Sequence, residues 1–160
     1  MEMRDPAHHV SSRAIVFWTV RALAGWLLLL AAELLWFLVA RDHAVLRFTA
    51  LIVTAFLAAA HLIVMPQWRY RVHRWEVTDN AVYTRSGWVT QERRIAPISR
   101  VQTVDTERGP LEQLFGLANV TVTTASAAGP LRIHALDRAT ADGMVAQLTE
   151  VTSRSQGDAT

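Results

Sequence analysis

The sequence carries few residues that could form a catalytic or metal-binding site. It contains no cysteine, which excludes thiol catalysis, disulfides and zinc–thiolate sites. Its 6 histidines include no pair with the helical spacing of metal ligands, and it has no glycine-rich phosphate loop. Asp105 and Glu107 would share one face of a strand, but they match no hydrolase motif. We therefore expect no catalytic, cofactor-binding or metal-binding residues, and a protein that is not an enzyme.

Two ionisable side chains stand inside long apolar runs, where a charge at the bilayer centre costs about 2.5–3.5 kcal/mol. Glu33 interrupts the first run and His61 the second. In an antiparallel hairpin they would lie about 10 Å apart along the membrane normal, too far for a hydrogen bond. We expect His61 near the interface. For Glu33 three alternatives stay open: a protonated carboxyl packed against its own hairpin, for example against Thr54; contact with a helix of another chain; or a proton or ion pathway.

The two apolar runs are each long enough to cross a bilayer, which takes about 20 residues. The first covers residues 14–40 after Ser12, a suitable N-cap. The second covers residues 48–65 and is predicted to end at Pro66. A signal peptide would be shorter and would show a cleavage site, and buried helices of a soluble bundle would show a polar face. The sequence therefore predicts a transmembrane hairpin over residues 14–65, preceded by a tail of residues 1–13.

Arginine placement predicts the orientation of this hairpin. The tails carry more arginines than the turn: Arg4, Arg13, Arg21, Arg69, Arg71 and Arg74 against Arg41 and Arg47. This excess favours both termini in the cytoplasm. All 16 basic residues are arginine, a composition typical of a GC-rich bacterial genome, and the net charge of +2 gives no reason to expect a nucleic-acid partner. We predict a multi-pass protein of a bacterial plasma (inner) membrane.

Small residues recur on the second apolar run at Ala50, Thr54 and Ala58, a spacing that allows close helix packing. The alternative is that alanine is simply abundant in this chain. Together with Glu33, these residues are the predicted contact with a partner helix.

Beyond Pro66 the pattern changes to short β-like runs separated by turn residues. The predicted strands cover residues 67–78, 81–85, 88–95, 101–107, 118–124 and 131–135. A short helix begins at Pro110 and ends at Gly116. A last helix, capped by Asp137, has an apolar stripe formed by Ala141, Met144, Val145, Leu148 and Val151. Residues 152–160 are polar and predicted to be a flexible tail. These elements predict a strongly bent sheet covered by the last helix.

Several segments of this region carry a family resemblance. They are WEVTDNAVY from Trp75, the turn at Gly87, PISRVQTVD from Pro97, GPLEQLFGLA from Gly109 and VTTAS from Val122. Over about residues 15–150 the chain resembles the bacterial pleckstrin-homology-like (PH-like) membrane proteins of the YdbS type, in which two spanning helices precede the domain. The resemblance implies a two-helix transmembrane hairpin followed by a mainly β PH-like barrel with a C-terminal α-helix, over residues 66–151.

Two functions follow from these patterns. Arg69, Arg71 and His73 would alternate onto one face of the first strand, beside Arg74, where each arginine near an anionic leaflet contributes about 1 kcal/mol. They would be lipid-headgroup contacts or topology determinants only. We expect a membrane-anchored PH-like scaffold or adaptor at the cytoplasmic face that binds a membrane-protein partner or self-assembles, as the missing partner of Glu33 suggests. The alternative is a component that senses anionic lipid headgroups or handles lipid.

Overall fold

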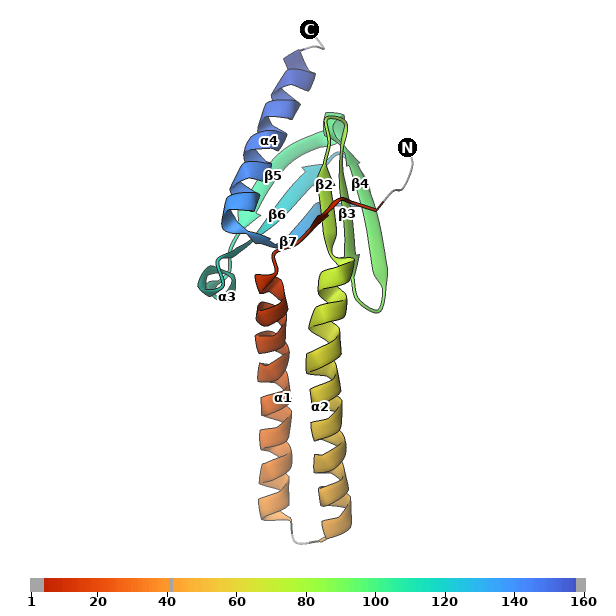
Figure 1. Ribbon diagram of the computed structural model, residues 1–160, viewed down its shortest axis with the longest axis vertical. Helices are drawn as coiled ribbons and strands as arrows, with labels where there is room; N and C mark the ends of the chain where they lie inside the picture. The colour runs from red at the N-terminus through yellow and green to blue at the C-terminus, as the bar shows by residue number, and fades with distance from the viewer. Residues whose placement is uncertain (1–4, 41, 158–160) are drawn as a thin grey trace.

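Two long helices form a stalk that carries a β domain at one end (Figure 1). The computed structural model describes residues 5–40 and 42–157, so that Arg4, Arg41 and residues 158–160 of the predicted tail lie outside the described residues. Helices α1 (Arg13–Val39) and α2 (Ala44–Val72) lie side by side, and both are long and apolar enough to span a membrane. Their apolar side chains are exposed over most of this length, as lipid-facing side chains are.

Helix α2 is longer than predicted, because Pro66 does not end it. The helix continues through this proline to Val72. A proline removes one backbone hydrogen bond, but the following turn still forms where packing holds it. Here Met65, Pro66 and Val72 are all buried. The predicted strand over residues 67–78 is therefore wrong in its first half, and only Arg74–Val77 (β2) is extended.

The β domain consists of two antiparallel sheets. The first contains β1 (His8–His9), β2, β3 (Ala81–Gly87) and β4 (Gln91–Pro97), and the second contains β5 (Val101–Glu107), β6 (Leu117–Thr124) and β7 (Leu131–Asp137). A 3₁₀ turn, η1 (Ile98–Arg100), joins the sheets, and α3 (Pro110–Leu114) joins β5 to β6. Gly116 follows α3 with a left-handed φ of 66°, which confirms it as the stop of this helix.

The core lies between the two sheets and the C-terminal helix α4 (Arg138–Gly157), which packs against the second sheet (Figure 1). The predicted apolar stripe of α4 faces this core. Ala141, Met144 and Leu148 are buried, and Val145 and Val151 pack against the core from its margin. The helix extends beyond its predicted end, to Gly157.

The N-terminal segment, predicted as a tail, is built into the β domain. Strand β1 pairs with β2, and the next residue, Val10, is buried. Ser11 then reaches the second sheet: its N–H donates to the carbonyl oxygen of Ala135 at 3.0 Å, and its hydroxyl donates to Asp137 Oδ1 at 2.7 Å. Ala135 has a left-handed φ of 59°, and the side chain of Asn119 accepts its N–H at 3.0 Å. The segment thus connects the edges of both sheets.

Candidate functional site

The helices and the β domain share one hydrophobic core. Ala14, Phe17 and Trp18, on the first two turns of α1, are buried in the same cluster as the β-domain residues. Met65 of α2 belongs to this cluster too. The Phe17 ring also meets the Phe115 ring, with centroids 5.9 Å apart. The domain is therefore packed onto its anchor and not tethered by a flexible linker.

At this junction, Trp18 contacts the side chains of Arg69 and His73. The guanidinium carbon of Arg69 lies 4.6 Å from the Trp18 ring centroid, and the His73 ring lies 5.0 Å from it. His73 Nδ1 donates to the carbonyl oxygen of Arg69 at 2.8 Å. Burial lowers the pKa of His73 to about 4, and burial also lowers the pKa of His134. Both histidines are therefore neutral at pH 7.

The predicted basic stripe of the first strand is not formed. Arg69 and Arg71 lie on α2, where side chains repeat every 3.6 residues and not every two, so they point to different sides. Arg69 is half-buried on Trp18, Arg71 is exposed and His73 is buried. Arg74 lies on β2, and its Nε is buried without a hydrogen-bond partner among the described residues. Only Arg71 of these residues presents a free cationic side chain to the surroundings of α2.

Inside the hairpin, Glu33 has a partner in its own chain. Thr54 Oγ1 donates to Glu33 Oε1 at 2.6 Å, whereas Glu33 Oε2 is buried with no partner among the described residues. Thr54 and Ala58 are buried, and Ala50 is half-buried. Of the three alternatives for Glu33, the structure displays the contact with the hairpin's own Thr54. Contact of these residues with a helix of another chain stays a prediction.

His61 also pairs within the hairpin. Trp26 Nε1 donates to His61 Nδ1 at 3.0 Å, and the Trp88 ring of the β3–β4 turn lies 5.7 Å from the imidazole. A loop of the β domain thus touches α2 more than two turns before that helix ends. Nothing in the sequence pattern indicated this contact, because it joins residues far apart in the chain.

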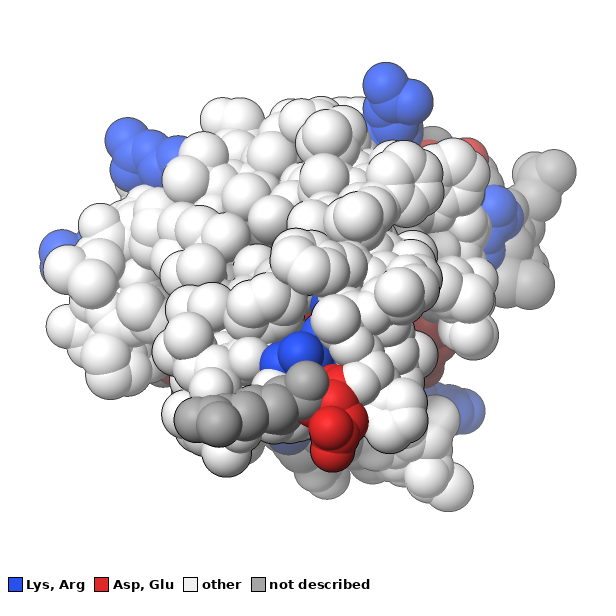
Figure 2. Space-filling view, turned by 90° about the horizontal axis from the view of Figure 1, so that it is seen from below, with Lys and Arg blue, Asp and Glu red and all other residues white. Residues whose placement is uncertain are grey.

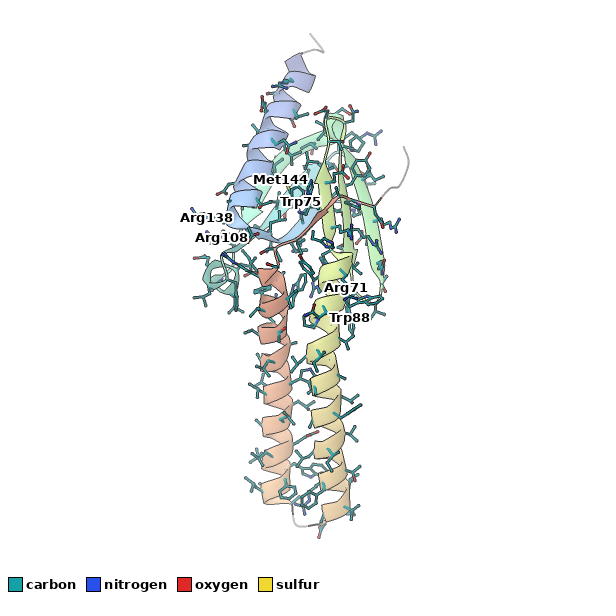
Figure 3. All side chains as sticks on the ribbon, in the orientation of Figure 1. Arg71, Trp75, Trp88, Arg108, Arg138 and Met144 are labelled. Carbon is teal, nitrogen blue, oxygen red and sulfur yellow. The ribbon has the colours of Figure 1, made fainter. Side chains whose placement is uncertain are left out.

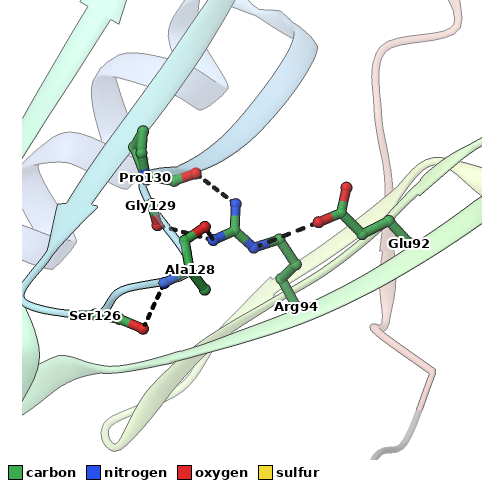
Figure 4. A network of polar contacts seen from close by, with 6 residues as sticks. All are labelled: Glu92, Arg94, Ser126, Ala128, Gly129 and Pro130. Carbon is green, nitrogen blue, oxygen red and sulfur yellow. Dashed lines mark hydrogen bonds and ion pairs between the residues drawn. The ribbon is translucent and has the colours of Figure 1, made fainter.

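Arg94 holds together the seam between the two sheets (Figure 4). Its guanidinium donates to three carbonyl oxygens of the β6–β7 loop, at 2.5 Å for Pro130, 2.6 Å for Ala128 and 2.8 Å for Gly129. Glu92 Oε1 lies 3.6 Å from the Nε of Arg94. The donors of Arg94 are therefore used within the fold, and this arginine closes the seam.

A pocket of about 390 Å³ opens beside the seam, between β4 and the β6–β7 loop. Arg93, Arg94 and Arg100 line it together with Ser126. Arg93 also pairs with Asp5 at 3.1 Å, while Arg100 is exposed and forms no ion pair with a described carboxylate. The sequence showed the charges but could not show that β4 and the loop enclose a cavity. The pocket suits an acidic or phosphorylated group.

Catalytic chemistry finds no support in the geometry. Among the described residues, no group of three or more His, Asp or Glu side chains could hold a metal ion. Asp105 and Glu107 are exposed on β5, and Thr103 donates to Asp105 Oδ2 at 3.1 Å.

The fold and this junction define a membrane protein with a two-helix anchor and a PH-like β domain. The model of the bacterial PH domain family matches residues 14–152, and the chain belongs to this family, which confirms the resemblance. The chain is also 38% identical over 65 residues to the UPF0699 transmembrane protein YdbS of Bacillus subtilis (strain 168). That alignment covers 41% of this chain and 41% of the relative, so that it spans about two fifths of the relative's length. No solved structure gives a significant match.

Proposed function

We propose that the protein is a non-enzymatic scaffold or adaptor at the cytoplasmic face of the bacterial plasma membrane. The shared core carries this proposal. Because Phe17 and Trp18 of α1 are buried with the β domain, the domain is held at a fixed height and orientation above the bilayer. Such rigid display suits a protein that positions a partner.

The cytoplasmic orientation of both termini is part of the proposal. Arg47, in the first turns of α2, is buried and donates to the carbonyl oxygens of Phe37 and Ala40 at the end of α1. These bonds satisfy orphan carbonyls and place a cation at the helix C-terminus. One of the two arginines at the turn thus has a structural role, which leaves the excess on the tails as the orientation signal.

The seam pocket is the proposed site for an acidic segment of a membrane-protein partner. Arg100 supplies an exposed cation in its lining, Arg93 supplies a second one that it shares with Asp5, and β4 supplies a sheet edge that no described strand covers. A single cysteine can be introduced at Ser126 in the pocket, or at the exposed Ala146 on α4 as a control, because the chain has no cysteine. A photo-crosslinker on each is then activated in native membranes.

The proposal expects an adduct of defined mass with one membrane protein from position 126, absent from position 146 and lost when Arg100→Glu is added. Identical adducts from both positions, or none that depends on Arg100, would contradict the pocket as the partner site.

Self-assembly through the helices is the second form of the proposal, with Glu33, Ala50, Thr54 and Ala58 as the helix contact. Glu33 Oε2, which has no hydrogen-bond partner among the described residues, and the half-buried Ala50 support it. The test is the oligomeric mass of the full chain in mild detergent. An oligomer that Glu33→Leu dissociates supports the contact, while a monomer for both proteins argues that Thr54 satisfies Glu33 alone.

Anionic lipid headgroups are the alternative ligand. The exposed Arg71, at the domain end of α2, favours them. In nanodiscs, the full chain should melt at a higher temperature with anionic lipid than with zwitterionic lipid, and Arg71→Gln should remove the difference. Arg154→Gln, far along α4, is the matched control. Equal melting in both lipids would exclude this alternative.

A further inference from the structure

The turn between β3 and β4 presents an apolar tip outside the domain core. Trp88 is 39% exposed and Val89 is 78% exposed. Gly87 makes the tight turn possible. Its φ of 114° is one that residues with a side chain rarely adopt, and a Cβ at this position would lie 1.9 Å from the carbonyl oxygen of Thr90. Moving the exposed surface of Trp88 and Val89 from water into an apolar environment would stabilise the protein.

The contacts of Trp88 place this tip at a definite level along α2. The indole of Trp68 donates to the carbonyl oxygen of Trp88 at 2.9 Å, and the Trp88 ring stacks edge-on against His61. The tip therefore lies between the levels of residues 61 and 68, and Figure 1 shows the turn beside the upper part of α2. A hydrocarbon core about 30 Å thick takes about 20 helical residues, which from Ala44 reaches residue 64. Trp88 is thus at the edge of the hydrocarbon.

The side chains around the tip are ordered as they are at a membrane interface. Trp68, 48% exposed, is hydrogen-bonded to Trp88, and the exposed Arg71 follows about one turn later on α2. Figure 3 shows Arg71 and Trp88 close to each other at the domain end of α2. Tryptophan is enriched at the headgroup level, and an arginine just outside it reaches lipid phosphates. Seen from the hairpin end, the molecule is largely uncharged apart from one group of charged side chains inside its outline, with further arginines at its rim (Figure 2).

We propose that the β3–β4 turn inserts Val89 and Trp88 into the same leaflet that α1 and α2 enter, so that the domain contacts lipid directly as a third membrane element. The partner is the lipid at the boundary between headgroups and acyl chains. This contact acts in addition to the shared core that contains Phe17 and Trp18, and it does not depend on the partner-binding role of the seam pocket.

Site-directed fluorescence in lipid vesicles tests this insertion with the full chain. An environment-sensitive fluorophore is attached to Val89→Cys, to Ile52→Cys on the lipid-facing side of α2 and to Ala146→Cys on α4. Val89 is replaced at an exposed position, so folding does not depend on it. Emission wavelength, quenching by aqueous iodide and quenching by lipids with a spin label on the acyl chain are measured for each.

The label at position 89 should emit at shorter wavelength than at position 146, lose iodide quenching and be quenched by the spin-labelled lipid, as at position 52. Emission and iodide access at position 89 equal to those at position 146 would overturn the inserted turn. Iodide access at both 52 and 89 would overturn the spanning assignment with it. The crosslinks from position 126 are unaffected by either result, so the two proposals fail separately.

Discussion

Replacing Trp18 with alanine tests whether the spanning helices and the β domain depend on one core. The Trp18 side chain is 4% exposed and packs on Arg69 and His73 at the junction. Truncating a buried tryptophan to alanine costs about 3–5 kcal/mol. In a chain of this size each kcal/mol lowers the melting temperature by roughly 2–4 °C. We therefore expect Trp18→Ala to melt about 6–20 °C below the wild type.

The measurement is thermal melting of the full chain in mild detergent, monitored by far-ultraviolet circular dichroism. Trp36→Ala is the matched control, because Trp36 lies on the same helix but is 42% exposed to the membrane side. It should change stability by less than about 1 kcal/mol. Equal decreases for the two variants would show that general helix hydrophobicity matters and not the junction. No decrease for Trp18→Ala would refute the shared core.

Three further perturbations have outcomes fixed by single contacts. Burial holds the pKa of His73 at about 4 against about 6.5 when unfolded, so the unfolded chain binds more protons below pH 6.5. Stability should be full above pH 6.5 and fall by up to about 3 kcal/mol towards pH 4, and melts of His73→Gln should lack that part of the slope. Thr54→Val should cost about 1–3 kcal/mol by leaving the Glu33 carboxyl unpartnered. A double-mutant cycle with Glu33→Leu should show that cost disappear, whereas additive effects would contradict the pair. Gly87→Ala should destabilise by about 1–3 kcal/mol, because its positive φ and the nearby carbonyl oxygen leave no room for a Cβ. Gly143→Ala on α4, where the added Cβ meets nothing within 4 Å, should instead stabilise by up to about 1 kcal/mol. Urea melts in which Gly87→Ala is stabilising or Gly143→Ala is destabilising would contradict the assigned conformations.

The predicted parts of the fold rest on local patterns. The spacing of apolar side chains was enough to predict the two long helices, the strand β6 and the helix α4. The stop of α3 at Gly116 was predictable because a left-handed backbone angle favours glycine. The end of α2 could not be predicted from Pro66, because the effect of a proline on a helix depends on packing that a sequence does not show. Residues 67–72 were predicted as a strand, in which side chains on one face repeat every two residues, and this placed Arg69 and Arg71 on one face. In the helix that these residues form, the repeat is 3.6 residues, so the predicted basic stripe is wrong.

The remaining features join segments that are distant in the sequence. Strand β1 has only two residues, and nothing in His8–His9 indicates β structure until β2 lies beside it. The seam pocket needs β4 and the β6–β7 loop to approach each other through Arg94. Thr54 was named as a possible partner of Glu33, but only the packing of the two helices shows that the hydroxyl reaches the carboxyl.

The placement of Ser11 has a consequence for how this protein is made. Its hydroxyl bonds to Asp137, 126 positions later, and its N–H bonds to Ala135 of the same strand, β7. Until β7 has been synthesised, the N-terminal segment can pair with β2 but has no edge of the second sheet to join. The two segments can meet only on the same side of the membrane, which in the proposed topology means that both helices have crossed it or that neither has. A chain with a single helix inserted would hold the segments on opposite sides and leave the domain incomplete, so under the proposed topology a complete β domain excludes a half-inserted hairpin.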